Sequence, residues 1–275
     1  WRTTEAAYAN ERQSVGGGRR ADLGGGRIKT QKNLGKGGKL AIDLSPQQIA
    51  SCSPSTGTYG CQGCNGGFTE GAYEYVKSAP GLANAFWIPY EQSLVASTPT
   101  AACPASKVSA IAGTDERLQG GYATVEGYHY ATPPCTSGAC KHQDLGKLKS
   151  ALEHTPVSVC VNAGVWNDYT GGVISAAACG SMSADSQDHC VMATGFNAEA
   201  PTPYWIVRNS WASTWGEEGY VYLEMSENTC GIADDVTIPE VKLDLTADEQ
   251  AEAVRGREAM YARATLNGQE GSARL

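Results

Sequence analysis

The chain has 275 residues, of which 41% are hydrophobic, and its formal net charge is −8. This length is enough for one large domain, or for two lobes with a substantial core, while the acidic charge argues against nucleic acid as a partner. No run of about eighteen apolar residues occurs, so no membrane partner is predicted, and ten cysteines are typical of a secreted rather than a cytosolic protein.

The N-terminal region divides into a helical and a glycine-rich part. Residues 1–13 have helical composition, with few helix breakers around Glu5–Ala9. Residues 14–39 are rich in glycine and in Lys and Arg, a composition that cannot bury enough apolar surface to order itself. A flexible insertion is therefore predicted there, rather than a phosphate-binding loop, which would need a flanking strand and a Gly-Lys-Ser/Thr signature.

Helices come first along the rest of the chain, and strands follow. Helices are predicted over 45–52, over 69–78 with a start that resembles a capping box, and over 143–153. Strands are predicted at Tyr122–Tyr128, Val157–Val161, Cys190–Phe196, Trp205–Asn209 and Tyr220–Met225. This order predicts an α+β enzyme with two lobes and an active-site cleft between them.

The last part of the chain, residues 241–275, has the composition of a C-terminal extension. A helix is predicted over 246–264, because Thr246 and Glu249 have capping-box spacing and helix formers follow, with disordered chain after it. Its apolar face is thin. The helix is therefore either solvated on all sides or the binding site of a partner.

His189 and Asn209 are the most informative pair of residues in the chain. Both lie on short, buried strand patterns, so an amide can hold an imidazole and set its tautomer, which leaves the other ring nitrogen for a nucleophile. We expect about 2.7–3.2 Å between their heavy atoms. Trp211 would cover this bond and exclude water. Cys190 is not a candidate nucleophile, because alternation along a strand points it away from the face of His189.

Six ordered segments between about Leu44 and Pro239 resemble the papain-like cysteine peptidases. They are Leu44–Cys52, Cys64-Asn65-Gly66-Gly67, Pro156–Val159, Asp188-His189, Asn209-Ser210-Trp211 and Asn228–Ala233. The resemblance implies a papain-like fold with a helical lobe over about 1–110 and an antiparallel β-barrel lobe over about 111–240. It implies hydrolysis of peptide bonds through a Cys-His-Asn site, with His189 as general base and Asn209 as its partner, and without a cofactor or metal.

The resemblance also implies where the nucleophile lies. No cysteine precedes Cys52, so the catalytic cysteine and the oxyanion-hole glutamine are expected before residue 1. Two registers remain open: Trp1 directly follows the catalytic cysteine, or Glu5–Ala9 matches the middle of the same helix. The chain is then expected to be an N-terminally truncated peptidase, inactive as it stands. The alternative is a catalytically dead homologue that acts as a binding protein.

The same resemblance supplies two disulfides. These are Cys52–Cys103 and Cys179–Cys230. Cys64 is expected to be unpaired or mispaired with Cys61, whereas Cys135 and Cys140 can close a local loop. Zinc at Cys61 and Cys64 is disfavoured, because no second Cys or His pair follows at the spacing of a zinc finger.

Eight residues are implied to bind substrate. They are Gly66, Gly67, Phe68, Cys160, Asp188, Cys190, Trp211 and Asp235. The glycines would present bare backbone to an extended peptide, and they also suit a tight turn. The pocket for the second residue before the scissile bond would be lined by Phe68, Cys160, Cys190 and Asp235. The thiols of the two cysteines would lie in its wall. Asp235 would select basic residues there, unless it turns to solvent beside Asp234.

The resemblance finally implies partners and a compartment. The partners are a peptide or protein substrate and a propeptide or cystatin-like inhibitor, with the protein itself a monomer. The compartment is lysosomal or vacuolar, or extracellular by the secretory route.

Overall fold

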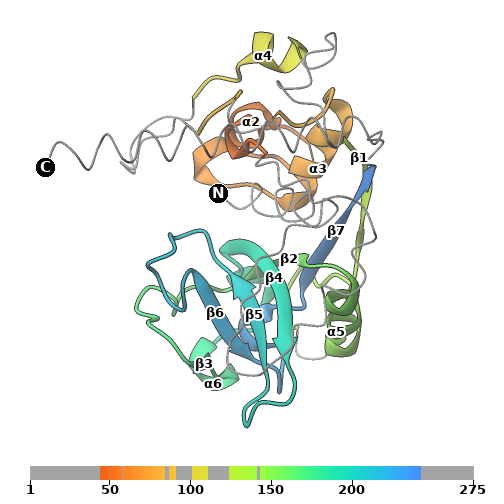
Figure 1. The fold of residues 1–275 in the computed structure, drawn as a ribbon. Coiled ribbons are helices and arrows are strands. Elements are labelled where there is room, and N and C mark those ends of the chain that lie inside the picture. The colour runs from red at the N-terminus through yellow and green to blue at the C-terminus, as the bar shows by residue number, and fades with distance from the viewer. Residues whose placement is uncertain are drawn as a thin grey trace, which may run out of the picture.

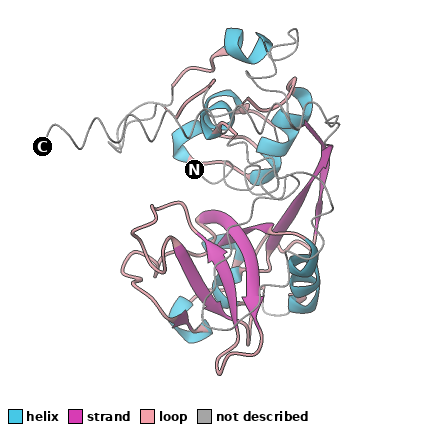
Figure 2. Cartoon of the chain, in the orientation of Figure 1, coloured by secondary structure: helices cyan, strands magenta, loops and turns pink. Residues whose placement is uncertain are grey.

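One half of the molecule is mainly helical, and the other holds the sheet together with a few short helices (Figures 1 and 2). The computed structural model describes residues 44–57, 59–83, 87–90, 101–110, 124–140 and 143–242. One half holds α2 (Pro46–Cys52), η2 (Gly63–Asn65), α3 (Thr69–Ser78) and α4 (Ala105–Ala110). The segments predicted over 1–13, 14–39 and 246–264 lie outside the described residues. Within the described ranges, no helix has the length and apolar character needed to cross a bilayer.

The other half is built on one seven-stranded sheet. Its strands are β1 (Thr124–Tyr130), β2 (Val157–Val161), β3 (Val173–Ile174), β4 (His189–Asn197), β5 (Tyr204–Arg208), β6 (Tyr220–Glu224) and β7 (Asp235–Lys242). The spatial order is β1-β7-β2-β4-β5-β6-β3, and every pair is antiparallel except β3 with β6. Four short elements flank it: α5 (Leu145–His154), α6 (Ala176–Cys179), η4 (Ala184–Ser186) and η5 (Thr229–Gly231). The expected α+β architecture is therefore confirmed.

Side chains alternate between the two faces of the sheet across the adjacent strands β7, β2 and β4. Val159 of β2 lies opposite Val191 of β4 and Val236 of β7, and all three valines are fully buried in the core of this half. The next rung pairs Cys160 with Cys190 and with Asp235. Because successive residues of a strand point to opposite faces, these three side chains leave the valine core and share the other face of the sheet.

A line of hydroxyl groups connects the two halves. In α3, the Thr69 hydroxyl lies 3.3 Å from the Thr237 hydroxyl of β7, and the Tyr73 hydroxyl lies 3.4 Å from it. Two separate apolar clusters lie on either side. The helical cluster consists of Leu44, Ile49, Ala72, Tyr73, Val76, Leu82 and Val125, whereas the valine core belongs to the larger cluster of the sheet half.

The predicted helix over 69–78 has the observed bounds of α3, but its predicted cap is wrong. Phe68 is the N-cap residue, and no side chain caps the helix. The Thr69 hydroxyl instead contacts Thr237 and donates to the Glu70 carboxylate, so tertiary contacts have taken the group that a capping box would use. Helix α5 begins at Leu145, because the side chain of Asp144 caps it by accepting from the Lys147 N–H at 2.9 Å.

Most predicted strands are found within one residue of their bounds. Strand β2 has the range predicted for it, β4 and β5 differ by one residue at each end, and β6 differs by one residue at its C-terminal end. Strand β1 continues to Tyr130, two residues beyond its prediction. The sequence did not predict β7, which pairs with both β1 and β2.

Four disulfides form among the described cysteines. Both predicted bonds, Cys52–Cys103 and Cys179–Cys230, are present, and Cys135 bonds to Cys140. Cys61 and Cys64 belong to none of the four. The fourth bond joins Cys160 to Cys190, so the expectation of two thiols at these positions is wrong. Their Cα atoms face each other across adjacent strands at 3.9 Å, which brings the two sulfur atoms within bonding reach.

We expect the Cys160–Cys190 bond to stabilise the sheet more than the Cys135–Cys140 bond does. The two bonds close segments with sequence separations of 30 and 5, and a longer closed loop restricts the unfolded chain more. Replacing both cysteines by Ala should cost ~3–4 kcal/mol at the first bond and ~2 kcal/mol at the second. Urea denaturation of the two double variants checks this order, and equal losses would contradict it.

Candidate active site

The imidazole of His189 and the amide of Asn209 are in direct contact. His189 is the first residue of β4 and Asn209 follows the last residue of β5, and His189 Nε2 lies 2.8 Å from Asn209 Oδ1. Their exposed fractions are only 8% and 5%. The predicted contact is therefore present, and it is shielded from water, where a hydrogen bond is stronger than at the surface.

The orientation of the Asn209 amide follows from a second bond. The Ser210 N–H donates to the same Oδ1 atom at 2.8 Å, so the group at this position must be the oxygen. An oxygen can only accept, which makes Nε2 of His189 the donor. In the neutral ring, Nδ1 then carries no proton and can accept one. Asn209 Nδ2 is buried without a hydrogen-bond partner among the described residues.

Two tryptophans contact the imidazole, and a third supports them. Trp211 stacks on it with 5.3 Å between ring centroids and an interplanar angle of 23°. Trp166 meets the same ring edge-on at 6.1 Å, and Trp215 holds Trp166 by donating its Nε1–H to the Trp166 carbonyl. The sequence predicted the role of Trp211 but not that of Trp166. The only signal for Trp166 was a large aromatic residue a few positions after β2.

Gly66 and Gly67 form a backbone turn that admits no side chain at its second position. A Cβ atom on Gly67 would lie 2.9 Å from the Cys61 Sγ atom, and Gly66 has a φ of 106°. The Gly66 carbonyl accepts from the Gln62 N–H, whereas no hydrogen bond within the described part of the chain engages the Gly67 backbone. Phe68, the next residue, has an exposed fraction of 53%.

Asp235 lies half-buried at the first position of β7. Its Oδ1 atom is buried and has no hydrogen-bond partner among the described residues. Burial, with the negative charges of Glu70 and Asp234, raises the pKa of Asp235 to about 7. Asp234, by contrast, is fully buried, with an exposed fraction of 0%.

Glu70 is a second buried carboxyl that the sequence did not single out. It lies in the first turn of α3 with an exposed fraction of 3%. The Tyr130 hydroxyl donates to its Oε1 atom at 2.9 Å, and the Thr69 hydroxyl donates to Oε2 at 3.2 Å. Glu70 is therefore stabilised by hydrogen bonds from two hydroxyl groups. Its charge also acts on Asp235.

Asp188 lies at the surface immediately before His189. Its Oδ1 atom accepts from the Ala163 N–H at 2.8 Å, which ties the start of β4 to the loop after β2. The structure therefore brings His189, Asn209 and Trp211 together, and gathers Cys160, Cys190 and Asp235 in one row on the other face of the sheet. Gly66, Gly67 and Phe68 precede α3, whose first turn contacts β7.

This arrangement is suited to proton transfer. An oriented imidazole with an unprotonated Nδ1 can take a proton from a thiol or hydroxyl and return it to a leaving group. Comparison with known proteins points the same way: the papain family cysteine proteases match residues 26–240. The chain belongs to this family.

Relatives with known names share about a third of their aligned residues with this chain. Human cathepsin O is 33% identical over 203 residues, which cover 73% of this chain and 53% of the relative. Thiol protease aleurain of Arabidopsis thaliana is 33% identical over 210 residues, covering 76% and 49%. The chain thus spans about half the length of these two relatives. Digestive cysteine proteinase 1 of Homarus americanus is 32% identical, covering 88% and 66%.

Solved structures confirm the papain-like fold. The bromelain protease of Ananas comosus, in complex with the E64 inhibitor, has a TM-score of 0.53 at 27% identity, covering 78% of this chain and 82% of that one. Digestive procathepsin L 3 of the Tenebrio molitor larval midgut has a TM-score of 0.54 at 28% identity, covering 72% and 56%.

We expect nitrogen-15 spectra of this chain to show the proton of the neutral His189 ring on Nε2. Substitution of Asn209 by Ala should remove the preference, because the acceptor that holds this tautomer is lost. His129 is a matched control, since it is exposed and contacts Glu240 through Nδ1. Its signals should be the same in both proteins, and a proton on Nδ1 of His189 in the unsubstituted chain would contradict the assignment.

Proposed function

We propose that the protein containing this chain is a cysteine peptidase, in which His189 is the general base and Asn209 positions it. The observation that supports this most directly is the 2.8 Å bond from His189 Nε2 to Asn209 Oδ1, with Trp211 stacked on the ring. The nucleophile is a cysteine N-terminal to the described residues, as in the family that the chain resembles.

The reaction uses the imidazole twice. Nδ1 takes the proton of the thiol, so that a thiolate and an imidazolium form a pair, and the thiolate sulfur bonds to the substrate carbonyl carbon. The imidazolium then protonates the leaving amine as the peptide bond breaks. Water hydrolyses the resulting thioester with the imidazole again acting as base, which releases the acid and regenerates the thiol.

The substrate is an extended peptide or protein. The Gly67 backbone offers an N–H and a carbonyl that no described residue engages, and an added strand pairs with such groups. The second substrate residue before the scissile bond lies against Phe68, the Cys160–Cys190 disulfide and Asp235. Asp188 contributes through the loop that it holds after β2.

The compartment is oxidising or connected to one. Four disulfides are typical of the secretory route, and we place the protein in a lysosome or vacuole or outside the cell. It acts as a monomer, and its macromolecular partners are a propeptide or a cystatin-like inhibitor that occupies the same substrate positions.

The proposal is tested with fluorogenic dipeptide substrates. The gene product with its natural upstream sequence should hydrolyse them, and a thiol-directed epoxide such as E64 should stop the reaction. We expect the 275-residue chain alone to be inert. Substitution of Asn209 by Ala in the longer protein should lower kcat/KM by roughly 100- to 10,000-fold, the range expected when the group that sets the tautomer is lost.

Asn197→Ala is the matched control, because Asn197 also ends a strand but lies far along β4 from His189, and it should retain activity. Epoxide-sensitive turnover by the 275-residue chain would show that the nucleophile is misassigned. If the longer protein binds peptides without cleaving them, the alternative is correct and the protein is a catalytically dead homologue that acts as a binding protein.

We expect Asp235 to favour Arg or Lys at the second position before the scissile bond. A partly desolvated carboxyl gains a partner from a basic side chain and gains nothing from Leu. Asp235→Ala should lower the ratio of kcat/KM for Arg over Leu substrates by about 10-fold or more. Asp168→Ala, at an exposed position, should leave the ratio unchanged. A ratio that Asp235→Ala does not alter would remove Asp235 as the selector.

A further inference from the structure

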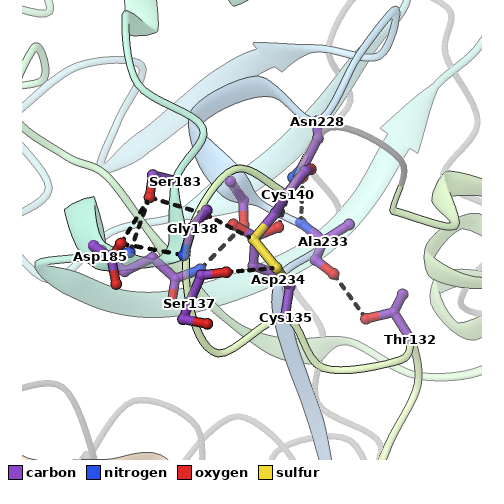
Figure 3. The surroundings of a disulfide bond; sticks show 12 residues. Thr132, Cys135, Ser137, Gly138, Cys140, Ser183, Asp185, Asn228, Ala233 and Asp234 are labelled. Carbon is purple, nitrogen blue, oxygen red and sulfur yellow. Dashed lines mark hydrogen bonds between the residues drawn. A yellow bond between two sulfur atoms is a disulfide. The ribbon is translucent and has the colours of Figure 1, made fainter.

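A second cluster of reactive groups lies away from His189, where the loop between Cys135 and Cys140 covers Asp234 (Figure 3). The two Sγ atoms and a carboxylate oxygen of Asp234 all lie within 4.8 Å of one another. Asp234 is fully buried and Cys140 has an exposed fraction of 4%, while Cys135 is half-buried. Nothing in the proposed peptidase reaction uses these three side chains.

The backbone holds both cysteines against Asp234. The Cys135 N–H donates to the Asp234 carbonyl at 2.9 Å. The Asn228 amide donates to the Cys140 carbonyl at 2.8 Å and to Asp234 Oδ1 at 2.6 Å. At the tip of the loop, Asp185 accepts from the Gly138 N–H. The cluster therefore keeps its geometry through bonds that do not depend on the disulfide.

One oxygen of Asp234 has no partner in the described structure. Oδ2 is buried and forms no hydrogen bond, and burial raises the pKa of Asp234 to about 7, although the amides of Asn228, Gln187 and Gln143 oppose this shift. Leaving a buried carboxyl oxygen unsatisfied is unfavourable. A buried carboxyl with one unsatisfied oxygen, in a cluster with two sulfur atoms, points to a cation as its ligand.

The donor set suits zinc. Two thiolates and a carboxylate are the ligand types that Zn²⁺ accepts in tetrahedral sites, and the two cysteines are separated by four residues, within the usual spacing for zinc ligands. Residues 133, 134 and 136–139 are exposed, so water can take the fourth position. Sulfur atoms on one tetrahedral zinc lie ~3.7 Å apart, given Zn–S bonds of about 2.3 Å, a separation that the loop allows.

We propose that Cys135, Cys140 and Asp234 form a zinc site that becomes available when the disulfide between the two cysteines is reduced. A dithiol reductant supplies two electrons and two protons: its own disulfide forms, the Cys135–Cys140 bond breaks, and two thiols result. Zn²⁺ then displaces both thiol protons to solvent and binds the two thiolates and the Asp234 carboxylate. The disulfide and the zinc complex exclude each other, because each needs both sulfur atoms.

A reductant can reach this disulfide through Cys135, which is half-buried. It closes the shortest segment, with a sequence separation of 5 against 30 and 51 for the others, so its closed loop restricts the unfolded chain least. The Cys160–Cys190 and Cys179–Cys230 bonds are buried, which denies a reductant access. Zinc bound here would fix the residue that precedes β7 and hence the strand that carries Asp235. The inference does not depend on the proposed peptidase activity.

The test uses Co²⁺ as a spectroscopic probe on the 275-residue chain reduced by a phosphine. We expect one Co²⁺ per chain, with a thiolate-to-cobalt charge-transfer band and the visible bands of a tetrahedral site, and no spectrum from the oxidised chain. Zn²⁺ should displace Co²⁺. Cys135→Ser with Cys140→Ser should abolish the spectrum, whereas Cys52→Ser with Cys103→Ser, at the other disulfide that reaches the surface, should leave it unchanged.

Asp234→Asn should weaken Zn²⁺ binding by roughly 10- to 100-fold. Asp185→Asn is its matched control, because Asp185 contacts the same loop outside the cluster, and should change binding less than about 2-fold. If Asp234→Asn fails to fold, the test is mass-spectrometric mapping of alkylated cysteines in the unsubstituted reduced chain. Zn²⁺ should then slow alkylation of Cys135 and Cys140. A spectrum that survives loss of these cysteines, but vanishes in Cys61→Ser with Cys64→Ser, would overturn the proposal, as would no spectrum at all.

Discussion

The two-residue period of the adjacent strands β7, β2 and β4 is the constraint on which both faces of the sheet depend. The rung of Val159, Val191 and Val236 is fully buried in the sheet core, and this apolar rung sets the register of each strand. A slip of β4 by one residue would bury Cys190 in that core and turn His189 to the other face. The energy that places the imidazole therefore comes from valines that take no part in chemistry.

The same period explains why two residues far apart in the chain meet. Arg208 of β5 pairs with Met192 of β4, so Asn209 falls on the face that also carries Val191 and His189. Diagonal neighbours on one face of an antiparallel pair are within reach of long side chains. The amide and the ring thus meet without a special turn, and the tryptophans that enclose them only need to exclude water.

Patterns in the sequence predicted those parts of the structure that depend on interactions between residues close in the chain or on neighbouring strands. The strand over Val157–Val161 and the contact of His189 with Asn209 follow from β-branched runs and from alternation, and both are observed. Strand β7 could not be recognised in this way, since it begins with an acidic residue and contains Pro239. Its strand character comes from pairing with β1 and β2, which are distant in sequence. Burial of Asp235 and Glu70, and the bond between Cys160 and Cys190, likewise arise only when the two halves and the neighbouring strands come together.

The hydroxyl line between the halves has a consequence for how the protein opens. Two apolar clusters are separated by Thr69, Tyr73 and Thr237, whose mutual bonds exchange readily with bonds to water. No disulfide among the described cysteines joins α2 or α3 to the sheet. The helical half can therefore detach as a cooperative unit of its own while the sheet stays folded, so amide hydrogens of α3 exchange through a subglobal opening of lower free energy than those of β2 and β4. These hydroxyl groups, with the Tyr130–Glu70 bond beside them, therefore bear on how readily the helical half separates from the sheet.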